Sequence, residues 1–593
     1  MVRRWLVSRV SAIAATLALL VAALPVAAAV TGDAQVTVGS PPTPFPQNKQ
    51  NEPGIARDPI SGTLIAGSND EIDLAPCTRT GGCPFTAGVG LSGVYFSFDN
   101  GASWSQPTYS GWSARTGTPV VGPIGTLPNY FEAGLVSNGD PILAVGPAPD
   151  AAGHFAWTNG SRYYYANLTE NFPGKNTLPT QFVAVAVSHT DDPVAAAAGH
   201  NNSVWSAPSI ASGRLNPVLF DDKSAIWADN AASSPFFGRV YVSWTAFRAA
   251  VSRSPNAAPE PIMIAHSDDG GITWSNPVQV TPATNNIRTG GRQGSTIRTD
   301  SHGVVFLFFE GNAAQFMSRS FDGGGTFDRP QAVAAVNDVG TFDAFQGRFT
   351  FDGQGGARTN SFPSVDIANN APLGAGATNT IVLGWSDAGR ANPFPGTLGN
   401  EVSLVQRSTN GGNTWSKPLA ASDPNDRPDF TAVAIAPDGS SVYVVYDAFT
   451  KPVNYANNLS TPRLMAGVVR GGNGDLTGFT ELHRGTQGDA RASSANGLTS
   501  EFIGDYNYAV ASNTSVTAVW NDVRAGADCA KVDAFRAALR SLPASTANPS
   551  GADFGEDDAA SAVAPTSPTR PFPPADCPAN FGNSDIFGGT FSR

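Results

Sequence analysis

Two short segments place an acid and an arginine directly after an apolar run. They read WSDAGR at 385–390 and VWNDVR at 519–524, so Asp387 and Arg390 correspond to Asp522 and Arg524. A guanidinium binds a carboxylate through two parallel charge-assisted hydrogen bonds, and a carboxyl group can accept or donate a proton in catalysis. The pattern is typical of a site for a carboxylated ligand. Equally, each acid could hold its own arginine in a structural ion pair.

Further segments carry the same residue types beside short apolar strands. DRPDF (426–430) and EFIGDY (501–506) precede such strands, and SND (68–70) follows one. Together with Arg292, which precedes a further strand, these segments contribute the candidate residues Asp70, Arg292, Arg390, Arg427, Glu501, Tyr506 and Arg524. For Tyr506, ordinary packing against the wall of a site is the alternative role.

A recurring strand–turn–strand pattern positions these residues. Each copy has a polar lead, a short alternating strand, a turn rich in Gly, Asp or Asn, and a second strand that ends in aromatic and acidic residues. The copies start at Asn51, Asn129, Asp221, Gly291, Ser361, Asp426 and Glu501. Short strands with such turns are typical of hairpins, and a repeat of about 50–70 residues with four strands predicts a β-propeller. We expect an all-β protein with seven blades; the copy at 129–188 is weak, so six blades remain open.

The propeller determines which residues can meet. The four strands of a blade, A to D, run outward from the axis, so residues before strand A and after strand B converge on one face. Turns between strands C and D lie on the opposite face. NSDIFGGTFSR (583–593) predicts a closing outer strand paired with AQVTVG (34–39), and the helical pattern near 528–545 predicts an insertion in the last blade. Residues 30–593 would form a single propeller domain.

A Ser-x-Asp-x-Gly-x-x-Trp motif recurs at the expected C-to-D turns. Its copies are FSFDNGASWSQP (96–107), HSDDGGITWSNP (266–277), SRSFDGGGTFDRP (318–330) and RSTNGGNTWSKP (407–418). The carboxylate can accept N–H bonds across the turn, glycine can take a positive φ, and the indole can pack on the neighbouring sheet. These structural roles fall to Asp99, Trp104, Asp269, Trp274, Asp322, Asn410 and Trp415. The motif resembles the Asp-box, or bacterial neuraminidase repeat, of the sialidase superfamily.

This resemblance implies a secreted glycoside hydrolase of exo-alpha-sialidase type, acting on terminal acidic sugars. Such enzymes bind the sugar carboxylate with an arginine cluster and use a tyrosine nucleophile. Carried over, the four arginines above bind substrate, Tyr506 with Glu501 is the nucleophile pair, and Asp70 is the acid/base. The family's arginine motif before the first strand is absent, since this place reads QNKQNEPGIARD (47–58). Two alternatives remain: a non-catalytic propeller that binds glycans or proteins, and a glycosidase or lyase that uses the acids without an arginine cluster.

Composition indicates an exported acidic protein. Residues 1–29 combine three arginines with AIAATLALLVAALPVAAA, which is typical of a cleaved signal peptide. Its removal would change the net charge of the 593-residue chain from −12 to −15. Nucleic-acid binding depends on neutralising phosphates, so this charge argues against it. No later segment is apolar enough to span a membrane. We expect a secreted, extracellular monomer whose partner is a glycan or glycoconjugate.

The four cysteines predict two disulfides in an oxidising compartment. Cys77 and Cys83 are close enough for a local clamp, which leaves Cys529 to pair with Cys577. Zinc is the weaker alternative, because no Cys-x-x-Cys and no nearby histidine is present. We expect no cofactor, although DPNDRPD (423–429) could offer oxygen ligands to a structural Ca²⁺.

Overall fold

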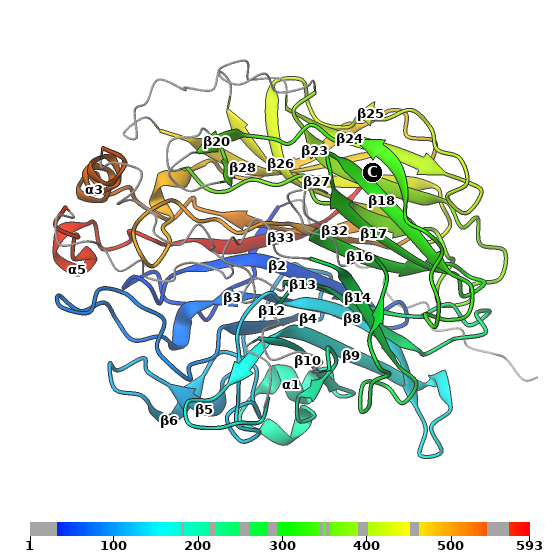
Figure 1. The fold of residues 1–593 in the computed structure, drawn as a ribbon, viewed down its shortest axis with the longest axis horizontal. Helices are drawn as coiled ribbons and strands as arrows, with labels where there is room; N and C mark the ends of the chain where they lie inside the picture. The colour runs from blue at the N-terminus through cyan, green and yellow to red at the C-terminus, as the bar shows by residue number, and fades with distance from the viewer. Residues whose placement is uncertain are drawn as a thin grey trace, which may run out of the picture.

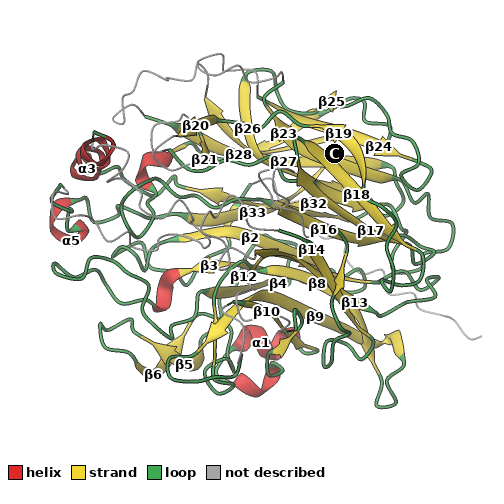
Figure 2. Cartoon of the chain, viewed as in Figure 1, coloured by secondary structure: helices red, strands yellow, loops and turns green. Residues whose placement is uncertain are grey.

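The structure, a computed structural model, describes residues 32–178, 183–213, 220–247, 260–282, 293–343, 348–351, 356–389, 401–450, 462–541 and 568–593. Regular structure in these ranges is almost entirely β-sheet, with a few short helices (Figure 2). In the same ranges, no helix is long and apolar enough to cross a lipid bilayer. The all-β prediction is confirmed.

Seven sheets form the seven blades (Figure 1). Blade 1 contains β2 (Gln50–Arg57), β3 (Leu64–Asp70) and β4 (Ser92–Ser97); blade 2 contains β7 (Leu135–Ser137), β8 (Ile142–Pro149), β9 (Phe155–Asn171), β10 (Ala184–Thr190) and β11 (Ser209–Ile210). Blade 3 contains β12 (Phe220–Ala228), β13 (Val240–Phe247), β14 (Ile262–Ser267) and β15 (Val278–Gln279); blade 4 contains β16 (Gln293–Thr299), β17 (Val305–Gly311), β18 (Ala314–Ser320) and β19 (Gln331–Ala335).

The remaining blades follow in chain order. Blade 5 contains β22 (Ser364–Ile367), β23 (Ile381–Asp387), β24 (Val402–Ser408) and β25 (Leu419–Ala420); blade 6 contains β26 (Asp426–Ile435), β27 (Ser441–Thr450), β28 (Leu464–Asn473), β29 (Thr480–Arg484) and β30 (Gly488–Asp489). Blade 7 contains β31 (Tyr508–Ala511), β32 (Ser515–Asp522), β33 (Asp585–Ser592) and β1 (Ala34–Gln35). Two hairpins lie outside the blades, β5 (Tyr109–Ser113) with β6 (Val120–Ile124), and β20 (Thr341–Asp343) with β21 (Arg348–Thr350).

The innermost strands close a ring around one axis. Contacts run from β2 to β8, β12, β16, β22, β26 and β31, and return from β31 to β2. The core lies between the blades, where apolar side chains of one sheet pack against the next. The seven-bladed prediction is confirmed, and the weak copy forms blade 2. Its long β8–β9 hairpin and the short helix α1 (Pro193–Ala198) explain why it matches the repeat poorly.

Both ends of the described chain meet in blade 7. Strand β1 is antiparallel to β33, with Ala34 opposite Gly588, and becomes the outermost strand of this blade. The Gln35 amide and the Thr37 hydroxyl both donate to Asp585 Oδ1, at 2.6 and 2.9 Å. The predicted closing strand is therefore present.

The four Ser-x-Asp turns share one hydrogen-bond pattern. At the second copy, Ser267 Oγ donates to Asp269 Oδ1 at 2.8 Å, and the backbone N–H of Gly271 donates to Ser267 Oγ at 2.8 Å. The Thr273 N–H and hydroxyl both bond to Asp269, so this carboxylate ties the turn together. Hydrogen bonds of the same kind occur at Asp99, Asp322 and Asn410.

An arginine of the preceding blade anchors three of these turns. Arg162, Arg239 and Arg319 donate to the backbone carbonyls of Gly270, Gly323 and Gly411, at 3.0, 2.7 and 2.8 Å respectively. Arg407 reaches Gly474 of blade 6 in the same way, at 2.8 Å. Each of these arginines therefore contacts the turn of the following blade, on the face away from the A-strand leads.

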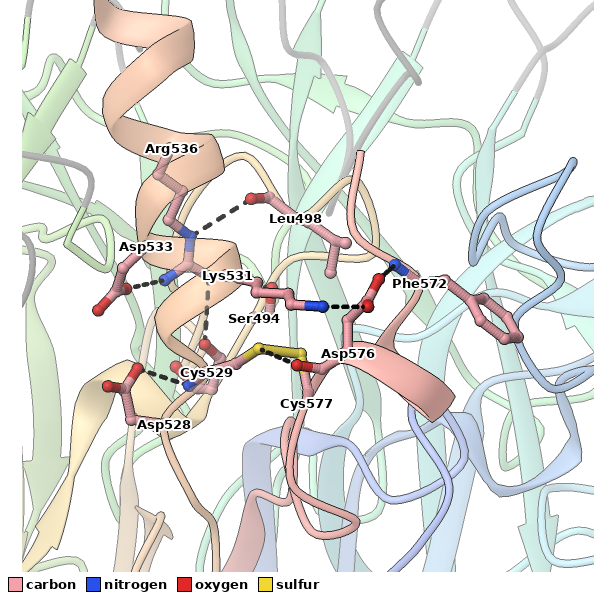
Figure 3. The surroundings of a disulfide bond; sticks show 11 residues. Ser494, Leu498, Asp528, Cys529, Lys531, Asp533, Arg536, Phe572, Asp576 and Cys577 are labelled. Atoms are coloured by element: carbon pink, nitrogen blue, oxygen red, sulfur yellow. Dashed lines mark hydrogen bonds and ion pairs between the residues drawn. A yellow bond between two sulfur atoms is a disulfide. The ribbon is translucent and has the colours of Figure 1, made fainter. Parts of the chain in front are cut away.

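Two disulfides and two helices cover the junction between the first and last blades. Helix α3 (Ala530–Arg540) lies between β32 and β33 in the chain, and α5 (Pro573–Asp576) lies beside it (Figure 1). The bonds join Cys77 to Cys83 and Cys529 to Cys577, as predicted. Lys531 Nζ lies 2.6 Å from Asp576 Oδ1 next to the second bond (Figure 3). All four sulfurs lie in or against one apolar cluster with Phe45 and Phe581.

Removing the Cys529–Cys577 bond by serine substitution is expected to lower the free energy of unfolding by about 2–4 kcal/mol. It joins residues 48 apart, so it restricts the unfolded chain more than the Cys77–Cys83 bond, which joins residues six apart. The matched Cys77→Ser/Cys83→Ser variant should lose less. Urea unfolding under non-reducing conditions, in which the other disulfide stays intact, measures both losses. Equal losses, or no loss from the longer crosslink, would contradict this account.

Candidate functional site

The first strands of several blades begin with a bulge that changes the direction of one side chain. Register is interrupted at this place in β2, β12, β16 and β26. Glu52, Lys223 and Phe430 have φ of 57°, 52° and 53° there, and Gly294 has 70°. A positive φ is costly for a residue with a Cβ, so the surrounding structure must hold these side chains in place. These residues lie at one end of the propeller axis, where the segments that precede the innermost strand of each blade meet. We call this end of the axis the mouth.

Lys223 lies at the mouth, between acidic and aromatic side chains. Its Nζ lies 3.7 Å from Asp505 Oδ2 and 3.5 Å from the centre of the Tyr506 ring. The ring of Phe362 is 5.2 Å away. Burial alone would lower the pKa of Lys223, but the carboxylates of Asp505, Glu52, Asp140 and Asp222 raise it. The side chain is therefore an ammonium ion between aromatic faces and acids.

Arg358 forms a bidentate ion pair with Asp505 at the mouth. Its Nε and Nη2 bond to the two carboxylate oxygens of Asp505 at 2.7 and 2.9 Å, a bidentate geometry. Its Nη2 also lies 3.5 Å from Glu52 Oε1. The Asn360 side-chain amide donates to the backbone carbonyl of Asp505 at 2.7 Å. These contacts hold the Asp505 carboxylate in one orientation.

Asp222 and Asp140 form a carboxyl pair on the opposite side of Lys223. Burial raises the pKa of Asp222, while Lys223 and a hydrogen bond with Asp140 act in the other direction. Gln293 Nε2 donates to Asp222 Oδ2 at 3.3 Å. The net effect is a raised pKa, so burial favours the protonated form of Asp222.

A cavity of about 50 Å³ opens beside Lys223 and Asp505. Its lining includes Lys223, Asp505, Tyr506, Asn360 and Phe362. This volume holds a few water molecules. A ligand could therefore place a hydroxyl or a similar small group at the centre of the mouth, between a carboxylate and an ammonium.

Arg427 and Arg524, both predicted to bind substrate, have acidic partners. Arg427 is 1% exposed and makes two 2.8 Å bonds to the carboxylate of Glu401. Arg524 Nη2 bonds to Asp522 at 2.7 Å and to Asp33 at 2.6 Å. Arg292 and Arg390 fall outside the described ranges. In the described ranges, acids rather than an arginine cluster therefore meet at the mouth.

The predicted catalytic residues lie in three different environments. Tyr506 lines the mouth cavity, and Lys223 Nζ lies 3.5 Å from the centre of its ring. Glu501 is buried, and its Oε1 accepts from Arg463 Nη1 at 2.6 Å. Asp70 is fully buried and accepts from Ser40, Gln50, Tyr95, Gln106 and the backbone N–H of Ile72. These hydrogen bonds join several segments of blade 1 through the Asp70 carboxylate.

The proposed ligands for calcium also have partners within the protein. The Asp423 carboxylate accepts from Asn425 N at 2.9 Å, and Asp426 accepts from Tyr446 and Arg484. In the part of the chain that the structure describes, no group of three or more His, Cys, Asp or Glu is arranged to hold a metal ion.

Sequence reasoning missed Arg358, Lys223 and Asp140. Lys223 directly follows an acid pair in DDKSAIW (221–227), but strand alternation does not predict where a bulged residue points. Arg358 lies in a lead, GARTNSFPS (356–364), and could have been included with the other residues that precede an A strand. Asp140 has a φ of 52° in the turn before β8, and its sequence context, SNGDP, indicates only a turn.

No protein-family profile matches the chain, and no curated protein matches it significantly. Solved structures do show similarity. The Hadza microbial sialidase has 15% identity over 68% of this chain, with a TM-score of 0.37, and the chain covers 63% of that protein. An ulvan lyase has 11% identity over 80% of this chain and 92% of its own, with a TM-score of 0.39. An alpha-L-arabinofuranosidase from Fusarium graminearum has 12% identity over 74% of this chain and 97% of its own, with a TM-score of 0.39.

Proposed function

We propose that this protein is an exported glycoside hydrolase that uses paired carboxylates at the mouth. Asp222, backed by Asp140, is the general acid, and Asp505 is the second carboxylate, acting as base or nucleophile. The main support is that both acids raise the pKa of one buried ammonium, that of Lys223, and that Lys223 lines an open cavity. Hydrolysis of a glycosidic bond requires one proton donor and one carboxylate, and the mouth offers both.

The two acids differ in the way this chemistry requires. Burial raises the pKa of Asp222 although Lys223 and Asp140 act against it, so this carboxyl group retains a proton at a pH at which an isolated aspartate has lost it. The Asp505 carboxylate accepts two bonds from Arg358, which fix its orientation. One group can therefore donate a proton to the leaving oxygen while the other acts on the anomeric carbon or on a water molecule.

The charge of the mouth favours a neutral sugar over an acidic one. Among the described residues, four acids (Glu52, Asp140, Asp222 and Asp505) lie around Lys223 and Arg358, and Arg298, which also lines the cavity, is paired with Asp366. Even with one proton on the Asp140–Asp222 pair, an anionic sugar would enter against a net negative charge. A sialidase-type reaction would instead depend on Tyr506 and on arginines outside this cluster. The rings of Tyr506 and Phe362 offer apolar faces to a sugar ring.

Hydrolysis should decline as pH rises through the raised pKa of Asp222, because a general acid must be protonated. Lys223 lowers that pKa by charge–charge interaction, so Lys223→Met should raise it further. The descending limb of the pH–rate profile should then move to higher pH, whatever the change in maximal rate. Measuring kcat/KM from pH 4 to pH 9 for both proteins provides the test, and a limb that stays in place or moves to lower pH would contradict it.

A screen tests the proposed activity directly. Secreted protein would be incubated with neutral polysaccharides, aryl glycosides and a fluorogenic sialoside, and released reducing sugar or aglycone would be measured. Turnover of a neutral glycoside is the expected result. Turnover confined to the sialoside would favour the sialidase-type reaction, and unsaturated products would indicate a lyase. Asp150→Asn, at an exposed turn on the other face, is the matched control for variants of the acids.

Non-catalytic glycan binding is the second candidate, and the small volume of the mouth cavity favours it. A whole sugar ring does not fit into this space, so the bound glycan would rest on Tyr506 and insert one substituent. A glycan array on the secreted protein distinguishes the two. Retention of a glycan that is never cleaved would support binding without hydrolysis.

A further inference from the structure

The central channel widens a second time at the face that carries the A-to-B turns. Here a cavity of about 420 Å³, which we call the rear cavity, is lined by the ends of all seven innermost strands. Small-molecule sites typically occupy about 300–1,000 Å³. The rear cavity therefore has the volume of a binding site, which the mouth cavity lacks.

The walls of the rear cavity consist largely of strand edges. Consecutive residues line it, such as Leu143–Val145 and Ala225–Trp227, whereas a strand that presented one face would contribute alternate residues. The innermost strands are the edge strands of their sheets, so one row of N–H and C=O groups on each is not used within its own sheet. The cavity is thus bordered by hydrogen-bond donors and acceptors at close spacing, between small apolar side chains.

The charged side chains that line the rear cavity have partners within the protein, and Arg57 Nη1 donates to Asn100 Oδ1 at 2.7 Å. Arg298 Nε lies 3.2 Å from Asp366 Oδ1, and the guanidinium lies 4.5 Å from the centre of the Trp227 ring. Arg298 and Tyr508 also line the mouth cavity, so they form the narrow part between the two spaces. Asn369 lies farther out in the lining. A charged ligand would compete with the Arg298–Asp366 pair, while a neutral one would not.

We propose that the rear cavity binds a neutral, polyhydroxylated small molecule of the size of a mono- or disaccharide, independently of the mouth. Hydroxyl groups can both donate to and accept from the strand edges. The apolar C–H faces of a sugar match the alanine side chains and the indole of Trp227. This site lies on the face opposite the proposed catalytic acids and does not depend on their role.

Calorimetric titration with D-glucose, L-arabinose, L-rhamnose and cellobiose tests the proposal. Ala511 is half-buried and lines the cavity, so Ala511→Trp would fill part of it. Ala102 is exposed in the first Ser-x-Asp turn, so Ala102→Trp adds the same side chain on the same face outside the cavity. Lys223→Met changes the mouth alone. Thermal unfolding of each variant shows whether the fold is retained.

We expect at least one of the four saccharides to bind to the wild type. Ala511→Trp should weaken that binding by about tenfold or more, and Ala102→Trp and Lys223→Met should leave it unchanged within about twofold. If Ala511→Trp fails to fold, Asn369→Ala, which shortens a side chain of the lining, takes its place with the same expectation. The proposal is wrong if none of the four saccharides binds, if Ala102→Trp weakens binding as much as Ala511→Trp, or if Lys223→Met abolishes it. The last result would assign the binding to the mouth.

Discussion

Asp222→Asn is expected to reduce hydrolysis of an unactivated glycoside by about 10²–10⁴-fold, the usual contribution of a positioned general acid. An asparagine amide keeps the shape of the side chain and its contact with Gln293, but it cannot deliver a proton. The fold should be retained, because the substitution removes a charge without creating a cavity. Rates are compared with those of wild type and Asp150→Asn at the pH of maximal activity.

The leaving group separates this role from a general effect on the site. The dinitrophenolate of a dinitrophenyl glycoside leaves without protonation. Asp222→Asn should therefore lose little activity on this substrate. Asp505→Asn should lose activity on both substrates, because the second carboxylate acts whatever the leaving group. An equal loss of both activities in Asp222→Asn would exclude Asp222 as the acid. A wild-type rate on the unactivated glycoside would remove the basis of the paired-carboxylate proposal.

Arg427→Ala is expected to lower the free energy of unfolding by about 3–5 kcal/mol, the range found when one partner of a buried ion pair is removed. Arg427 is 1% exposed and Glu401 is 5% exposed, so the remaining carboxylate would stay buried without its cation. The guanidinium also lies 4.2 Å from the centre of the Phe351 ring and donates to the Phe351 carbonyl. Urea unfolding measures the loss.

A double variant provides the control. Arg427→Met with Glu401→Leu removes both charges and retains most of the volume, so it should recover much of the stability that Arg427→Ala loses. Unchanged stability of Arg427→Ala with lost affinity for a carboxylated sugar would be the opposite result. It would restore the substrate-binding role that the sequence suggested for this arginine.

Strand positions were predictable because alternation and turn residues act locally. Asp505 and Tyr506 were expected at the mouth and line its cavity. They belong to a segment that precedes the innermost strand of a blade, and such segments all lie on the same face of the propeller. The bulge at Lys223 was not predictable in this way, because its register shift depends on pairing with β13. The role of Arg427 depends on Glu401, which lies 26 residues earlier, just before a strand of another blade. Local pattern therefore indicates which residues lie at the mouth, and contacts between blades determine which of their charges are paired.

The pairing of β1 with β33 has a consequence for the order of folding. Gln35 and Asp585 are bonded across 550 residues, so β1 has no partner in blade 7 until β33 has been synthesised. Contacts of such sequence separation form slowly, because the ends of a long chain must first meet. Six blades can assemble as the chain emerges, but blade 7 stays incomplete until β33 has been synthesised. During that interval, the incomplete seventh blade exposes an unpaired strand edge that a second chain could join.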